Sequence, residues 1–181
     1  MLKVKGIGWV KENKYGCTYK SIGKEYTDLR SLHLNLQQDK ILKYPIDNFA
    51  RFDTASKLVS CAIALGLYDA GISYAKGRMQ DIGLIATNLL GAEDANLAYF
   101  KDYVTNGRTL GRANLFIYTL PSSPLAEAAI HFGFTGPLLY VGLETKQLLE
   151  QAASFVINKE VQGMLAISFT SDSASCFAIK K

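Results

Sequence analysis

Cysteine, proline and histidine are all scarce in this chain, and each scarcity excludes a class of protein. Its three cysteines, Cys17, Cys61 and Cys176, are too widely spaced to form a Cys-x-x-Cys pair or a disulfide framework. Four prolines and 20% charged residues argue against a disordered or low-complexity chain. The only histidines are His33 and His131, and no His, Cys and carboxylate cluster has metal-ligand spacing. We therefore expect a reduced protein without a metal or another cofactor.

Long apolar runs are also missing. The longest apolar segment, residues 58–67, has the length of one buried helix and is far shorter than the roughly 20 residues of a membrane span. The opening Met1-Leu-Lys-Val-Lys5 alternates apolar and charged residues, whereas a secretory signal needs an unbroken apolar stretch. These patterns predict a cytoplasmic protein that does not enter a membrane.

The chain has little excess charge, and that excess is N-terminal. Residues 1–25 carry six lysines against Glu12 and Glu25, which accounts for the net charge of +4. Such an excess is typical of solvated strands and loops, and it also fits a patch for an acidic partner. Because no basic helix or interleaved basic and aromatic pattern stands out, we expect no nucleic-acid binding.

Apolar residues are abundant in the chain, and this abundance predicts one α/β domain over residues 1–181. With 49% hydrophobic residues it can bury a full core. Residues 4–10 are predicted to form a strand in which Gly6 and Gly8 let another backbone approach closely. Residues 11–45 are left mostly unassigned, apart from a short strand around 17–21.

Downstream, apolar patterns alternate between helix and strand. Asp53 or Thr54 is expected to cap a helix over 54–70 that Gly71 ends. The later predicted elements are a strand at 82–87, a helix at 93–106 with Leu97, Phe100 and Val104 on its inner face, a helix from Pro124 to Gly133, a strand at 138–141, a helix at 144–158, and strands at 163–169 and 174–179. This alternation predicts a mixed, mostly parallel sheet covered by helices.

Two segments carry a resemblance to a known family. Phe116-Ile-Tyr-Thr-Leu-Pro-Ser-Ser-Pro124 and Ala128-Ala-Ile-His-Phe-Gly-Phe-Thr-Gly-Pro137 resemble the stretch that leads to the active site in β-ketoacyl synthases. Three other segments follow in that family's order: Gly6-Ile-Gly8, the helix from Ser56 to Gly71, and Ile82-Gly-Leu-Ile-Ala86. The resemblance implies half of a thiolase-like fold, that is, a truncated β-ketoacyl synthase N-terminal-like domain.

The resemblance also implies where a nucleophile would stand. In that family a strand and a helix follow the Gly-Pro pair, and the helix begins with the acyl-accepting cysteine, whose pKa the helix N-terminus lowers. Counting from Gly136-Pro137 places Thr145 there. A threonine hydroxyl needs a base, and Glu144 at a helix start favours its own ionised form. The family's catalytic histidines, or a histidine and an asparagine, come from a C-terminal half that we expect to be absent.

The other candidate residues favour structural roles. His131 lies in the helix before the Gly-Pro pair, where the family pattern places no catalytic group. Cys61 is expected on the buried face of its helix as a small core residue. Ser122-Ser123 is typical of a polar turn before a helix. We therefore expect no catalytic, cofactor-binding or metal-binding residue.

The implied function is a non-catalytic accessory subunit, similar to a chain length factor, in fatty acid or polyketide-type synthesis. A lone half-fold would leave apolar faces of helices 54–70 and 144–158 in water, so we expect a homodimer or a heteromer with a ketosynthase, with strand 138–141 at the interface. An acyl carrier protein is a further expected partner. The alternatives are a condensing or acyl-transfer enzyme of the 3-oxoacyl-ACP synthase type, which uses acyl thioesters and is completed by a partner subunit, and an oligomeric structural protein that has left the pathway.

Overall fold

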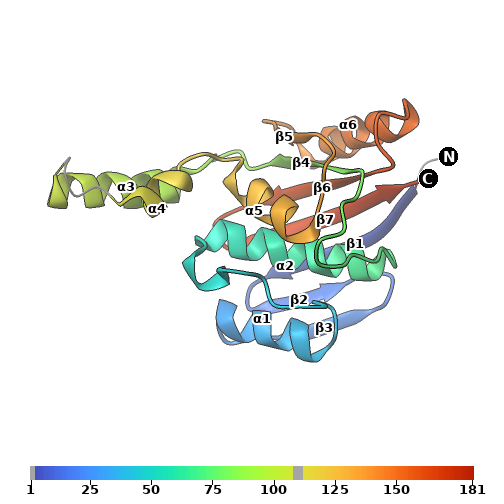
Figure 1. Cartoon of the computed structure of the whole chain (residues 1–181), viewed down its shortest axis with the longest axis horizontal. Helices are drawn as coiled ribbons and strands as arrows, with labels where there is room; N and C mark the ends of the chain where they lie inside the picture. The colour runs from blue at the N-terminus through green and yellow to red at the C-terminus, as the bar shows by residue number, and fades with distance from the viewer. Residues whose placement is uncertain (1–2, 108–111) are drawn as a thin grey trace.

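The computed structural model describes residues 3–107 and 112–181, which build a seven-stranded sheet with helices on both faces (Figure 1). The strands are β1 (Lys3–Lys11), β2 (Lys14–Cys17), β3 (Ile22–Glu25), β4 (Ile82–Thr87), β5 (Leu138–Tyr140), β6 (Gly163–Phe169) and β7 (Ser173–Lys180). The α-helices are α1 (Leu29–Gln38), α2 (Thr54–Asp69), α3 (Glu93–Asn106), α4 (Ala113–Ile117), α5 (Ser123–Phe132) and α6 (Thr145–Ile157), and a 3-10 helix spans Phe49–Arg51.

The sheet has the strand order β3-β2-β1-β7-β6-β4-β5. β4 pairs in parallel with both β5 and β6, while β7 runs antiparallel between β6 and β1. It follows that β1, β4, β5 and β6 all point the same way. The β2–β3 hairpin extends the sheet beyond β1. The prediction of a mixed, mostly parallel α/β sheet covered by helices is confirmed.

The core is organised around α2. It packs on the sheet and against α1 and α5, whereas α6 covers the opposite face with a second apolar cluster that includes Leu148, Ala152 and Val156. A Cβ on Gly8 would fall inside contact distance of the Gly66 backbone nitrogen, and one on Gly6 would meet the backbone of Ala70. The predicted close approach of another backbone at Gly6 and Gly8 is confirmed.

Three sequence-based expectations about packing and local structure are wrong. Residues 18–21 are the turn of the β2–β3 hairpin and not a strand. Leu97, Phe100 and Val104 do not form an inner face, because their exposed fractions are 51%, 62% and 65%. Helix α2 leaves no large apolar face in water, because α1 and α5 of the same chain cover it.

The unassigned region 11–45 holds a helix, α1, that the sequence analysis missed. Its N-cap is Asp28, whose Oδ1 accepts a hydrogen bond of 2.7 Å from the Ser31 backbone N–H. Leu32 and Leu36, four residues apart, are its buried residues. The Asp28 cap and that spacing were available in the sequence as a helix signal.

A single carboxylate ties the end of α2 to β1 and to the β2–β3 turn. Asp69 accepts hydrogen bonds from the backbone N–H groups of Ile7 at 2.8 Å, Tyr19 at 3.1 Å and Lys20 at 2.8 Å. Burial by itself would raise the pKa of Asp69, but these donors outweigh it, so the pKa lies below the ordinary value.

No helix within residues 3–107 and 112–181 combines the length and the hydropathy that crossing a bilayer requires.

Replacing Gly8 with alanine should destabilise the fold by at least about 3 kcal/mol, since the added methyl group meets backbone that has no room to move. Gly23→Ala is the matched control, because a Cβ there meets nothing within 4 Å, and it should change stability by less than about 1 kcal/mol. Urea unfolding measures both variants. Equal effects would contradict the close packing of α2 on β1.

Removing the Asp69 charge should make stability less dependent on pH. A lowered pKa stabilises the folded state above the unfolded pKa of roughly 3.9, and this contribution disappears as the pH falls through the folded pKa. Asp69→Asn should therefore lose about 2 kcal/mol at pH 7 and clearly less near pH 3. Denaturant unfolding at several pH values measures this, with the exposed Glu150→Gln as the control. A loss that stays constant with pH would refute the role of the charge.

Candidate functional site

The carboxyl ends of β1, β4, β5 and β6 lie at one edge of the sheet, and the candidate site is there. A cavity of about 490 Å³ opens between the start of α2, the start of α3 and the turn that joins β6 to β7. Its volume falls within the roughly 300–1,000 Å³ of small-molecule sites. In open α/β sheets, ligands bind outside the carboxyl ends of the parallel strands.

The cavity wall is mainly apolar, with polar groups at several points. The apolar side comprises Phe52, Ala55, Leu90, Ala92, Ala95, Ala98, Tyr118, Leu120, Pro121, Pro124 and Phe169. The polar side chains are Asp53, Thr54, Lys57, Asn88, Glu93, Asp94, Thr170 and Ser171. The wall thus combines hydrogen-bonding groups with apolar surface, which suits a ligand that has both polar and apolar parts.

The end of β4 holds one side of the cavity in place. The Asn88 side chain accepts a hydrogen bond from the Leu90 N–H at 3.0 Å and donates one to the Gly91 carbonyl at 2.9 Å. Its own carbonyl accepts from the Tyr140 hydroxyl. Thr87, one residue earlier, donates to the Leu143 carbonyl at 2.7 Å. The cavity wall is thereby joined to the loop that leads from β5 to α6.

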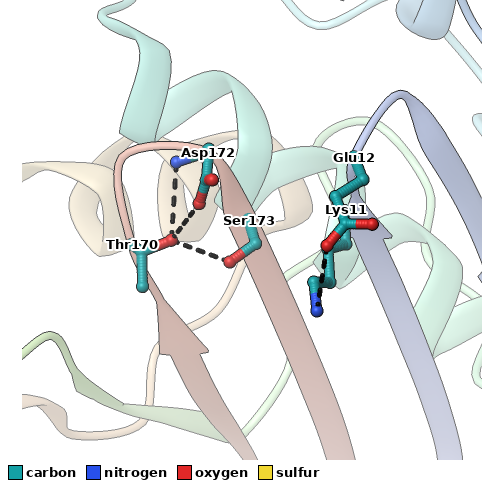
Figure 2. Close-up of polar contacts among 5 residues, drawn as sticks. All are labelled: Lys11, Glu12, Thr170, Asp172 and Ser173. Atoms are coloured by element: carbon teal, nitrogen blue, oxygen red, sulfur yellow. Dashed lines mark hydrogen bonds and ion pairs between the residues drawn. The ribbon is translucent and has the colours of Figure 1, made fainter.

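The β6–β7 turn forms another side, and Figure 2 shows its polar contacts. The Thr170 hydroxyl donates to the Asp172 carboxylate at 2.6 Å, so the 2.7 Å contact with Ser173 has the Ser173 hydroxyl as donor. Figure 2 also shows the ion pair of Lys11 and Glu12 at the end of β1, with an N–O distance of 3.2 Å. Both of its side chains are exposed, so it contributes little to stability.

Tyr118 brings a buried hydroxyl to the cavity wall. Its side chain donates a hydrogen bond of 3.2 Å to Oε1 of Glu127. Burial first, and the Glu127 carboxylate second, raise the pKa of Tyr118 above its ordinary value. The phenol therefore stays neutral near pH 7.

Thr145 is the first residue of α6 and is exposed. It follows the loop that Thr87 and Asn88 anchor, yet it is not among the residues that line the cavity. Glu144 precedes it as the N-cap, and the Glu144 N–H donates to Gln147 Oε1 at 3.4 Å. The predicted position at a helix tip is confirmed. Its equivalence to a nucleophile stays a prediction.

Neither histidine approaches Thr145, because the sheet separates them. His131 on α5 packs against Tyr44, with ring centroids 4.7 Å apart, and burial lowers the pKa of His131 to about 4. His33 on α1 stacks on Phe49 at 4.2 Å. Both lie on the α2 side of the sheet, whereas Thr145 begins the helix on the other side. His131 is half-buried near the end of its helix, as expected.

The remaining candidate residues, the three cysteines and Ser123, have surroundings that indicate structural roles. Cys17, Cys61 and Cys176 are free and buried, and burial raises the pKa of each thiol. Ser123 begins α5 and donates to the Ile117 carbonyl at 2.5 Å. In the part of the chain that the structure describes, no cluster of His, Cys, Asp and Glu could hold a metal ion.

The cavity itself was missed by the sequence analysis. Asp53 entered that analysis only as a helix cap, a role that its 2.8 Å hydrogen bond from the Ser56 N–H confirms. Asn88 follows directly after the apolar strand, and polar residues at the end of a parallel strand are a usable signal for a site. Thr170 follows β6 in the same way.

Of the comparisons with known proteins, only the comparison with solved structures gives matches. No protein-family model and no curated protein matches the chain. Among solved structures it is similar to the ishigamide ketosynthase/chain length factor, with a TM-score of 0.66 and 12% identity over 98% of this chain and 61% of that one. A ketosynthase in complex with its chain length factor from Xenorhabdus doucetiae matches with a TM-score of 0.63 and 12% identity over 99% of this chain and 79% of that one.

A third structure is a type II polyketide synthase acyl-carrier protein in complex with its ketosynthase, with a TM-score of 0.67 and 11% identity over 99% of this chain and 58% of that one. The chain thus spans about three fifths of the first and third of these structures. At such identities the likeness concerns the fold. The chain has the fold of part of the ketosynthases and chain length factors, as the resemblance in the sequence predicted.

Proposed function

We propose that this chain is a non-catalytic ketosynthase-like subunit, similar to a chain length factor, that serves fatty acid or polyketide-type synthesis as a single domain in the cytoplasm. The observation that carries the proposal is the tip of α6. In the family that the sequence resembles, the helix after the Gly-Pro pair begins with a nucleophilic cysteine. In this chain that helix begins with Thr145, whose side chain is a hydroxyl, and the three thiols of the chain are buried elsewhere.

The surroundings of Thr145 support the proposal that its hydroxyl does not act as a nucleophile. A helix N-terminus stabilises a thiolate, but the pKa of an alcohol is too high for the same effect to produce an alkoxide near pH 7. A threonine nucleophile therefore needs a base within hydrogen-bond reach. Among the described residues, His33 and His131 are on the far side of the sheet, and the adjacent carboxylate of Glu144 is a helix cap.

The proposed partner is a ketosynthase, with an acyl carrier protein as a second partner. One structure of this fold is a ketosynthase in complex with its chain length factor, and another holds an acyl-carrier protein with its ketosynthase. In this chain β5 is the last strand of the sheet. Leu84 N–H bonds to the Pro137 carbonyl and Val141 N–H to the Ala86 carbonyl, so the N–H of Leu138 points outward and is available to a partner strand.

The competing function is an acyl-transfer or condensing enzyme that a partner subunit completes. The exposure of Thr145 at the positive end of a helix favours this alternative, because a partner could place a base against its hydroxyl. The two functions differ in whether this chain ever carries an acyl group.

Incubation of the purified protein with acyl thioesters, alone and with its ketosynthase, should leave its intact mass unchanged. The expected result is an adduct on the ketosynthase only, since no thiol or activated hydroxyl of this chain is reachable. Intact-protein mass spectrometry gives the readout. A stable adduct that disappears in Thr145→Ala would replace the accessory role with the enzyme role.

Leu138→Pro should weaken binding to a ketosynthase from the same organism by at least about tenfold. The substitution removes an outward backbone donor without touching the bonds to β4, and proline is tolerated at such edge positions. Leu138→Ala is the matched control, because it loses the same side chain and keeps the N–H. Biolayer interferometry compares the dissociation constants. Absence of binding by the wild type would reject the proposed partner.

A further inference from the structure

The connection between α1 and α2, residues 40–52, is an irregular segment that we call the strap. Its only regular element is the 3-10 helix Phe49–Arg51. The strap leads directly to the candidate site, because Phe52 and the following Asp53 line the cavity. Its buried side chains belong to the core around α2: Ile41, Leu42, Ile46, Phe49 and Phe52.

The only two histidines of the chain hold the middle of the strap, one from α1 and one from α5. Nε2 of His33 accepts a hydrogen bond of 3.1 Å from the Ile46 N–H, and the His33 ring stacks on Phe49. The hydroxyl of Tyr44 donates to the His131 carbonyl at 2.9 Å, and the two rings pack together. Both histidines thus contact the same segment.

The bond from Ile46 determines which nitrogen of His33 carries the proton in the neutral ring. Because a backbone N–H only donates, Nε2 of His33 is the acceptor and Nδ1 carries the proton. The Gln37 side-chain amide lies 3.1 Å from Nδ1. A second proton can enter the ring only at Nε2, and both nitrogens of a charged histidine are donors. A charged His33 is therefore incompatible with the closed strap.

His131 is also suited to the strap only in its neutral form. Its Nε2 atom is buried and has no hydrogen-bond partner among the described residues, so a proton there would be buried unpaired. Asp47 of the strap favours the charged ring, whereas His33 and Lys76 disfavour it, and burial outweighs all three. Aromatic rings surround the imidazole: Tyr44, Tyr74 and Phe132.

The backbone of the strap is strained at two points. Lys40 at its start has a φ of +57°, and Asn48 before the 3-10 helix has a φ of +59°. Residues with a side chain rarely adopt this left-handed conformation, and lysine adopts it less readily than asparagine. The closed conformation therefore depends on the contacts that the strap makes with its surroundings.

We propose that the strap is an acid-sensitive latch, which the two neutral histidines hold closed and which opens when either of them takes up a proton. The latch acts on the candidate site through two phenylalanines. The ring of Phe49, which stacks on His33, packs against Phe52 with centroids 6.2 Å apart. Because Phe52 lines the cavity, opening of the strap removes one part of the cavity wall.

The direction of the pH effect follows from the two side chains. Burial lowers the pKa of both histidines in the closed form. The open form therefore binds protons more tightly, and opening becomes more favourable as the pH falls below about 6.5. For His131 alone, a pKa that falls from 6.5 to about 4 on closing raises the opening constant about 20-fold between pH 7 and pH 5.

Amide hydrogen exchange of the whole protein at pH 7 and pH 5, corrected for the intrinsic pH dependence of exchange, tests the latch. Peptides from the strap should show an opening constant that rises at least about 20-fold. β6, whose residues are almost all buried, is the internal reference for global unfolding. It should exchange more slowly than the strap at both pH values.

Two variants remove the titrating groups without removing the contacts. His131→Phe keeps an aromatic ring and loses no hydrogen bond at Nε2, and His33→Gln keeps a neutral acceptor for the Ile46 N–H. In the double variant the rise between pH 7 and pH 5 should fall below about threefold. Gln38→His is the matched control, because it adds an exposed histidine to α1, and it should behave as the wild type.

Three results would each overturn the latch: a strap whose opening is the same at pH 7 and pH 5, a pH dependence that the double variant retains, and strap exchange that coincides with that of β6. Each single variant removes one contribution, so the test does not rest on the folding of one protein. The proposal is independent of the proposed function, because Thr145 and β5 lie outside the strap.

Discussion

The close contact between the backbone of α2 and that of β1 is the constraint on which the rest of the structure depends. It exists because Gly6 and Gly8 carry no side chains where the two elements meet, and on α2 the lack of a side chain at Gly66 leaves room for Cys176 of β7. At the end of the helix, the carboxylate of Asp69 accepts hydrogen bonds from three backbone N–H groups, one in β1 and two in the β2–β3 turn. The contact and this clamp together determine where both ends of α2 lie relative to the sheet.

The position of α2 in turn determines the candidate site. Its first turn, with Asp53 and Thr54, stands at the carboxyl edge of the sheet because its last residue is held at the other edge. β4 and β6 end at the same edge, and their polar residues Asn88 and Thr170 complete the cavity wall. The hydrogen bonds from Thr87 and Tyr140 then join this wall to the loop before α6. One rigid helix thus connects the packing of the core to the ligand-sized cavity at the carboxyl edge of the sheet.

The sheet also decides what chemistry the chain can perform by itself. It separates the two histidines on the α1 and α5 side from Thr145 on the α6 side, so the described residues bring no imidazole to the helix tip. Burial holds all three thiols in the protonated form. The accessible features of the described chain include the cavity and the open edge of β5.

The sequence by itself determined the elements whose signals are local. The Asp53 cap and Gly71 bound α2, the unbroken apolar run 82–87 is β4, and the apolar pattern over 144–158 is α6. Only the tertiary structure decided which apolar faces are covered, because burial depends on what a fold places opposite each helix. Periodicity alone could not show that α2 is enclosed by α1 and α5, or that Leu97, Phe100 and Val104 face solvent. For the same reason the cavity was invisible in the sequence: its walls come from segments far apart in the chain, and their meeting is a property of the packed sheet.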